Sequence, residues 1–125
     1  MRAIAILLAF RLAAGAQTAT FNSSGFDTLG YDGQFQVIHS VGTVSGTTPT
    51  LNGKLQHSID NGSTDPYADI TGATFTQVTA SNSTQTLNLD RNATKRYVRY
   101  VGTIAGTSPS FTMGVFINAF KKVRP

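Results

Sequence analysis

The stretch VGTVSGTTPTL at residues 41–51 recurs without a gap as VGTIAGTSPSF at residues 101–111. Each copy begins with a run that contains β-branched residues and ends with a second, alternating run. Between the two runs lies a corner, GTTP at residues 46–49 and GTSP at residues 106–109. Two strands joined by a short loop that contains Gly and Pro have this pattern. The repeat therefore predicts two similar β-hairpins at the centre of the fold.

Side chains on a strand alternate between the two faces of its sheet, so the residues around each corner can be assigned to faces. After the corner, the positions predicted to face the core are Leu51, Leu55 and Ile59 in the first copy and Phe111, Met113, Val115, Ile117 and Ala119 in the second. Before the corner, bulky residues occur on both faces of each copy. His39 and Arg99, at matching positions of the repeat, are two of them. Bulk on both faces is typical of central strands.

Short strands and turns fill the rest of the chain. Residues 60–66 are rich in turn formers, residues 74–79 and 84–89 alternate as strands do, and residues 69–73 can form one helical turn at most. The β-branched residue Thr is frequent, and only 13% of the residues are charged. We expect an all-β fold, a β-sandwich of possible jelly-roll type, with an apolar arm or strand at residues 1–26 and a single domain at residues 27–125.

The first sixteen residues resemble a secretory signal, because a basic start precedes an apolar run and the small residues Ala14, Gly15 and Ala16. Arg11 interrupts that run, however, and a membrane-spanning helix needs about 20 apolar residues. We therefore expect an ordered N-terminal strand or arm, covered by its own sheet or by another subunit, and no membrane association.

Charge is unevenly distributed along the chain. The net charge is +4, no Cys is present, and all six acidic residues are Asp. The acids lie between Asp27 and Asp90, and the part that follows is basic. Its basic residues are Arg91, Lys95, Arg96, Arg99, Lys121, Lys122 and Arg124. We expect these to contact an acidic protein surface. Nucleic acid is the second choice, because neither a recognition helix nor an RNA-binding pattern is present.

Few residues could carry catalysis. His39 and His57 are the only histidines, and the second copy of the repeat has Arg99 and Ile117 in their places. Strand positions that tolerate such different side chains are expected to be structural. The sequence does not bring together a nucleophile and a base that could form a catalytic site in a pocket. We therefore expect no enzymatic activity and no cofactor.

Oxygen atoms of Asp60, Asn61, Ser63 and Asp65 could bind Ca²⁺, but the EF-hand spacing and its Glu are missing. Asp and Asn also bond to the local backbone in turns, so no metal site is predicted, although an ion in this loop is left open. A secreted carbohydrate-binding β-sandwich module is the main rival class. Against it, the chain has no Trp, and Tyr67 is the only aromatic residue near this turn.

Three stretches are similar to a known class of proteins: LQHSIDNGS at residues 55–63, DITGATF at residues 69–75 and RYVRYVGTIAGTSP at residues 96–109. They resemble small structural proteins encoded in the morphogenesis regions of tailed bacteriophages and prophages, such as head decoration or cement proteins. The resemblance implies a virion protein on the capsid surface, assembled in the host cytoplasm, that binds the major capsid protein or another virion protein and stabilises its subunits. It also implies a homo-oligomer, with a trimer expected first. A tail or head–tail connector component is the alternative.

The two copies of the repeat differ on the face that points away from the predicted core. Phe116 and Phe120 stand there in place of Gln56 and Asp60, and a folded monomer gains nothing by exposing two Phe rings. We expect this face to be buried between subunits or against the shell, with the N-terminal apolar segment as a candidate cover. The predicted interface residues are Phe116, Phe120, Arg96, Arg99, Lys121, Lys122, Ile6, Leu8 and Phe10.

Overall fold

A computed structural model describes the backbone of residues 4–123 and the side chains of residues 9–120. Its elements, in chain order, are β1 (Ile4–Gln17), β2 (Phe21–Asn22), β3 (Phe26–Asp27), β4 (Tyr31–Ser58), β5 (Ala68–Thr74), β6 (Ser83–Asp90), the 3₁₀ turn η1 (Arg91–Ala93) and β7 (Tyr97–Val123). The seven strands form one open antiparallel sheet. The all-β prediction is confirmed, whereas a sandwich of two separate sheets is not, because hydrogen bonds link these strands into a single sheet.

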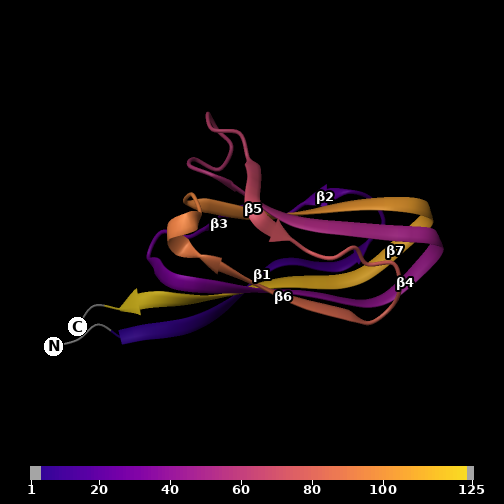
Figure 1. Cartoon of the computed structure of the whole chain (residues 1–125), viewed down its shortest axis with the longest axis horizontal. Coiled ribbons are helices and arrows are strands. Elements are labelled where there is room, and N and C mark those ends of the chain that lie inside the picture. Colours follow the sequence, from indigo (N-terminus) through magenta and orange to yellow (C-terminus); the bar gives the residue numbers. More distant parts are fainter. Residues whose placement is uncertain (1–3, 124–125) are drawn as a thin grey trace.

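The centre of the sheet consists of β4 and β7, which pair with each other over most of their lengths. Residues 31–44 of β4 pair with residues 111–121 of β7, and residues 50–58 pair with residues 97–105. Both strands turn back at the same end of the molecule (Figure 1). The prediction of two separate hairpins is therefore wrong. Each copy of the repeat turns back at its corner, but its hydrogen bonds go to the other copy.

The two corners meet each other, and their pairing is reciprocal. Thr47 pairs with Thr107, its own equivalent in the repeat. Ser45 lies opposite Ser110. In the repeat, Ala105 is equivalent to Ser45 and Thr50 to Ser110, and these two residues also lie opposite each other. Reciprocal contacts of this kind are those of a local two-fold axis. The repeat therefore encodes one shared bend in a two-stranded ribbon.

The bend brings the two halves of the sheet face to face, and the core lies between them (Figure 1). The buried apolar residues are Phe35, Val37, Val41, Leu51, Leu55, Ile70, Ala73, Phe75, Val78, Leu89, Val98, Tyr100, Val101, Phe111, Met113, Val115, Ile117 and Ala119. The core positions predicted after each corner are confirmed with one exception. Ile59 is 61% exposed, because β4 ends at Ser58 and the chain leaves the sheet there.

A β-bulge in β4 makes the two copies differ before the corner. Between two paired positions β4 advances by three residues, from Val41 to Val44, while β7 advances by two. The extra residue moves the side chains that precede it to the other face of the strand. Consequently His39 lies in the core, whereas Arg99, at the matching position of the repeat, lies on the outer face.

The shorter strands flank this centre. The strand predicted at residues 84–89 is confirmed as β6, but residues 74–79 do not form a strand: β5 ends at Thr74, and Val78 makes a single bridge to Leu51. Residues 69–73, predicted as a turn at most, belong to β5. β1 pairs with β7 along its length and so is part of the sheet. Among the described residues β1 has no second neighbour, which makes it an edge strand.

Candidate binding site

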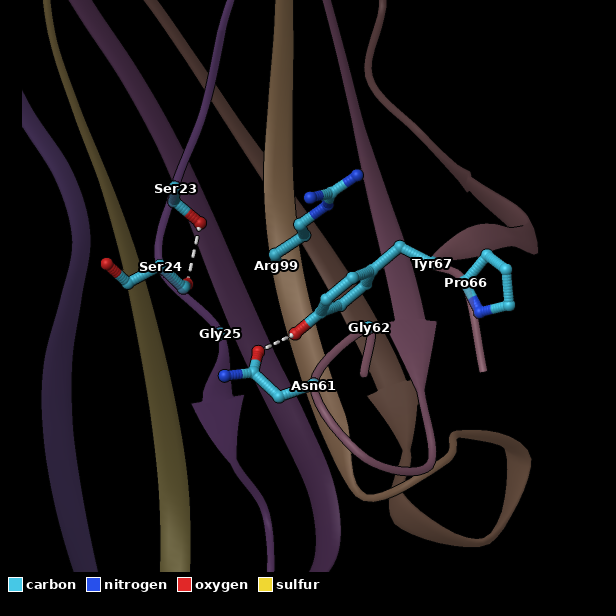
Figure 2. A pocket seen from close by; sticks show the side chains of 8 residues that line it. All are labelled: Ser23, Ser24, Gly25, Asn61, Gly62, Pro66, Tyr67 and Arg99. Atoms are coloured by element: carbon cyan, nitrogen blue, oxygen red, sulfur yellow. Dashed lines mark hydrogen bonds between the residues drawn. The ribbon is translucent and has the colours of Figure 1, made fainter. Parts of the chain in front are cut away.

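A pocket of about 560 Å³ opens between the segment that carries β2 and β3 and the loop that follows β4. Its lining residues come from three separate parts of the chain: Ser23, Ser24 and Gly25; Asn61, Gly62, Pro66 and Tyr67; and Arg99 on β7. Figure 2 shows the ring of Tyr67 between Arg99 and Asn61. Arg99 is the only charged residue in this lining, so the pocket carries a positive charge.

The guanidinium of Arg99 is held in one position. Its Nε and Nη2 atoms both donate to Gln56 Oε1, at 3.1 and 2.8 Å, and its Cζ atom lies 4.2 Å from the centroid of the Tyr67 ring. A cation at this distance is attracted to the ring face. Gln56 donates in turn to Asp69 Oδ1, and Asp69 forms an ion pair with Lys54 at 2.9 Å. The negative charge nearest to Arg99 in this chain of contacts is therefore already balanced by Lys54.

Tyr67 is fixed at its hydroxyl end as well. The hydroxyl donates to Asn61 Oδ1 at 2.6 Å, and burial raises the pKa of Tyr67, so the group stays protonated at neutral pH. A Cβ atom on Gly25 would lie 2.3 Å from both Asn61 Oδ1 and the Tyr67 hydroxyl. A side chain at this position would have to push both groups aside. Gly25 therefore lets the loop after β4 close onto the segment between β2 and β3 without moving Asn61 or Tyr67.

The turn after β4 is held together by its own carboxylates. Asp60 accepts hydrogen bonds from the Thr64 hydroxyl and from the backbone N–H groups of Thr64 and Asp65, which lower its pKa to about 2. Asp65 accepts from the N–H of Ile59 and from Lys95 Nζ, and these donors lower its pKa. Both carboxylates thus accept hydrogen bonds from donors within the chain. No group of three or more His, Cys, Asp or Glu in residues 9–120 is placed to hold a metal ion.

The two histidines lie apart and have different surroundings. His39 is fully buried, with Nε2 2.7 Å from the Tyr100 hydroxyl and its ring stacked on Phe75 at 4.7 Å. Burial lowers the pKa of His39 to about 4, so the ring is neutral at pH 7. Nδ1 of His57 accepts the backbone N–H of Lys95. Neither histidine lines the pocket.

The outer face of β7 carries the two phenylalanines that the alternation placed there. Phe116 is 36% exposed and Phe120 is 42% exposed, so the predicted face assignment is confirmed. The Phe116 ring lies across Gly114, where a Cβ atom would be 2.7 Å from it. Within one chain, the N-terminal segment does not lie over these rings, because β1 pairs with the edge of β7 in the same sheet.

The other predicted interface residues have different surroundings. Arg96 binds Asp27 through Nε and Nη2, at 3.0 and 2.9 Å, and this interaction lowers the pKa of Asp27. Phe10 packs inward, with its ring centroid 5.0 Å from that of Phe26 and 5.6 Å from that of Tyr31. Phe10 therefore belongs to the core side of β1, and we leave it out of the interface. The side chains of Ile6, Leu8, Lys121 and Lys122 lie outside the described residues.

Arg99, Asn61 and Tyr67 are candidates from the sequence, each for a different reason, whereas nothing in the sequence marks Ser23 or Gly25. No sequence pattern joins these residues, because the pocket forms only when three distant segments meet. A scan against protein-family models and a search of curated proteins both found no match to the chain. Within the part of the chain that the structure describes, no helix has the length and apolar character needed to cross a membrane.

Proposed function

We propose that the protein is a non-enzymatic structural component of a tailed-phage virion, specifically a decoration protein that attaches to the capsid and bridges its subunits. The observation that carries the proposal is the outer face of β7, where Phe116 and Phe120 remain exposed. The resemblance of the stretches at residues 55–63, 69–75 and 96–109 to phage structural proteins supplies the context.

An uncharged area lies between the two rings. Asn118 pairs with Gln36 in the row between Phe116 and Phe120, and Ile38 of β4 lies opposite both Phe116 and Thr86 of β6. Charged residues border this area, because Arg11 of β1 pairs with Phe116 and Asp32 of β4 pairs with Phe120. An uncharged area loses less hydration energy than a charged one when it is buried, and burial of the part of each ring that is still exposed contributes about 0.5–1 kcal/mol.

The free edge of β1 supports assembly into an oligomer. β1 spans Ile4–Gln17, and β7 is its only strand neighbour among the described residues. Its other edge carries backbone N–H and C=O groups that a strand of a second subunit can pair with. A homo-oligomer can therefore form by strand addition, and the trimer expected from the resemblance remains part of the proposal.

The polar groups of the described residues support a structural role over catalysis. Nε2 of His39 bonds to Tyr100, although its Nδ1 is buried without a hydrogen-bond partner. His57 bonds to the backbone of Lys95, and Asp65 bonds to Lys95 Nζ. The rival sugar-binding function would need an open aromatic ring. The guanidinium of Arg99 lies over one face of Tyr67, the ring that lines the pocket, and this argues against a sugar platform there.

Locating the chain in purified particles tests the proposal. The particles that the parent genome produces would be compared with particles from a deletion of this gene, by mass spectrometry and electron microscopy. We expect density for the chain on the capsid surface, its loss in the deletion, and lower resistance of the deleted particles to heat. Density at the tail or connector would favour the alternative location, and absence of the chain from particles would refute a virion role.

A further inference from the structure

We infer that the pocket around Arg99 is a binding site for a carboxylate group, presented by an Asp or Glu side chain on the surface of a partner protein. The inference takes from the proposed function only the protein nature of the partner. Its basis is the charge and the hydrogen-bonding capacity that the pocket leaves unused.

Arg99 is a cation with unused donors. A guanidinium has five N–H donors, and Gln56 Oε1 accepts only one from Nε and one from Nη2. The remaining N–H groups have no hydrogen bond to any described residue, and no described carboxylate forms an ion pair with Arg99. Because a planar guanidinium matches a carboxylate with two parallel hydrogen bonds, these free donors favour that ligand.

The acidic residues around the pocket do not satisfy Arg99, because each already has a partner. Asp69 pairs with Lys54, Asp65 with Lys95, and Asp60 accepts the donors of its own turn. The pocket lining contains no acid. An anion from outside the chain is therefore the complementary ligand.

The site is also preorganised for such a ligand. The Tyr67 ring and Gln56 fix the guanidinium from two sides, so little side-chain entropy is lost on binding. The amide oxygen of Asn61 accepts from Tyr67, which leaves its amide nitrogen pointing away from the ring as a second donor (Figure 2). A volume of about 560 Å³ accepts an acidic side chain together with the residues beside it.

Charge and spacing favour a carboxylate over the phosphates of a nucleic acid. One unpaired cation matches a single negative charge, whereas a nucleic-acid backbone needs a row of free bases. The neighbouring bases Lys54, Lys95 and Arg96 are each paired with an Asp. Among the described residues near the pocket, Arg99 therefore lacks the companions that would follow a phosphate chain.

The test is an NMR titration of the ¹⁵N-labelled full chain with a capped peptide of alternating Asp and Ser. We expect saturable shifts of the Arg99 Nε–H and the Asn61 side-chain amide, and no such shifts with the peptide in which Asn replaces Asp. Arg99→Gln should weaken binding about tenfold or more, because charge-assisted hydrogen bonds are lost. Arg99→Lys keeps the charge without the planar guanidinium, so its affinity for the peptide should lie between those of the parent chain and Arg99→Gln. Arg11→Gln removes the same charge from β1, outside the pocket, and should bind the peptide as the parent chain does.

Three results would overturn the inference: unchanged binding by Arg99→Gln, no saturable shift at Arg99, or tighter binding of inorganic phosphate or single-stranded DNA than of the acidic peptide. The dispersed spectrum of each variant reports in the same experiment that it is folded. If the peptide does not bind while the chain still attaches to particles, the pocket assignment fails and the proposed function stands. If the peptide binds but the chain is absent from particles, the carboxylate site stands and the virion role fails.

Discussion

Gly46 lies so close to Ser108 that a Cβ atom on it would come within 2.7 Å of the Ser108 carbonyl oxygen. The relationship is reciprocal, since a Cβ atom on Gly106 would come within 2.8 Å of the carbonyl oxygen of Thr48. The corners of the two copies thus pack on each other at their backbones. This contact explains why the Gly is present at the same place in both copies.

Gly46→Ala should destabilise the fold more than Gly15→Ala does. The φ angles are similar, at 112° and 106°, and such a conformation costs an L-residue about 1–3 kcal/mol in either place. Nothing lies within 4 Å of a Cβ atom on Gly15, whereas the methyl group on Gly46 meets backbone atoms of the other corner. Urea denaturation of both variants would measure the difference. Equal losses of unfolding free energy would mean that the corners relax and that their contact adds nothing.

Stability should fall as the pH is lowered from about 6.5 to about 4. His39 has its ordinary pKa of 6.5 in the unfolded chain and a pKa of about 4 in the folded chain, because burial disfavours the charged ring. Between these values the unfolded state binds more protons, so protonation favours unfolding, by about 3 kcal/mol over the whole interval. Unfolding free energies measured by urea titration across this range would test the effect.

His39→Gln should be less stable at pH 7 but should have a flatter pH profile. Burial also lowers the pKa of His57, which acts in the same direction, so His57→Gln is the matched control and should keep most of the slope. If the profile of His39→Gln runs parallel to that of the parent chain, the acid sensitivity arises elsewhere.

The sequence was sufficient to predict which residues of the long strands face the core, because a period of two is a local property. Leu51, Leu55 and Phe111 are buried, and Phe116 and Phe120 are exposed, as the alternation indicates. The pairing of the strands could not be predicted in the same way. A corner such as the one at Gly46 is compatible both with a closed hairpin and with a bend in a two-stranded ribbon, and only long-range contacts decide between them.

The bulge and the pocket were beyond local patterns for the same reason. The residues from Val41 to Val44 do not differ from their counterparts in any way that indicates an extra residue, yet the bulge buries His39 and leaves Arg99 outside. The charge pattern predicts Arg99 as a basic interface residue. Its contact with Tyr67 depends on how the loop after β4 closes onto Gly25, which no spacing in the sequence specifies.

Attachment to the partner should weaken as salt concentration rises. The screening length falls from about 30 Å at 0.01 M to about 3 Å at 1 M, which reduces the attraction between exposed charges. In residues 91–99, Lys95 and Arg96 are each paired with an Asp, and Arg91 donates to the Thr28 carbonyl oxygen. We expect most of the effect from Arg99, because it lines the pocket without an ion pair to a described residue. Co-sedimentation with particles over this range would measure it, and Arg99→Gln should show a smaller salt dependence. Attachment that does not change with salt would assign the basic residues to solubility alone.

Changing both Phe116 and Phe120 to Ser should weaken oligomerisation or capsid attachment while the isolated fold survives. The two rings are 36% and 42% exposed, so their removal opens no large cavity in the core. Because only these fractions of the rings are left to bury, an interface over both would contribute about 1–2 kcal/mol, which is enough to lower attachment by a factor of about 10. Size-exclusion chromatography and co-sedimentation with particles would measure the loss, and circular dichroism would report the fold.

The matched control for this prediction is the pair Leu29→Ser and Ile59→Ser. Both residues are 61% exposed and lie in loops outside the β7 face, so their replacement removes exposed apolar surface without touching the proposed interface. We expect attachment of this control to equal that of the parent chain. If the Phe116 and Phe120 double variant loses its β-sheet signal, the rings stabilise the isolated domain and the face is not a docking surface. If both double variants attach equally well, the contact with the capsid must be made by another part of the molecule.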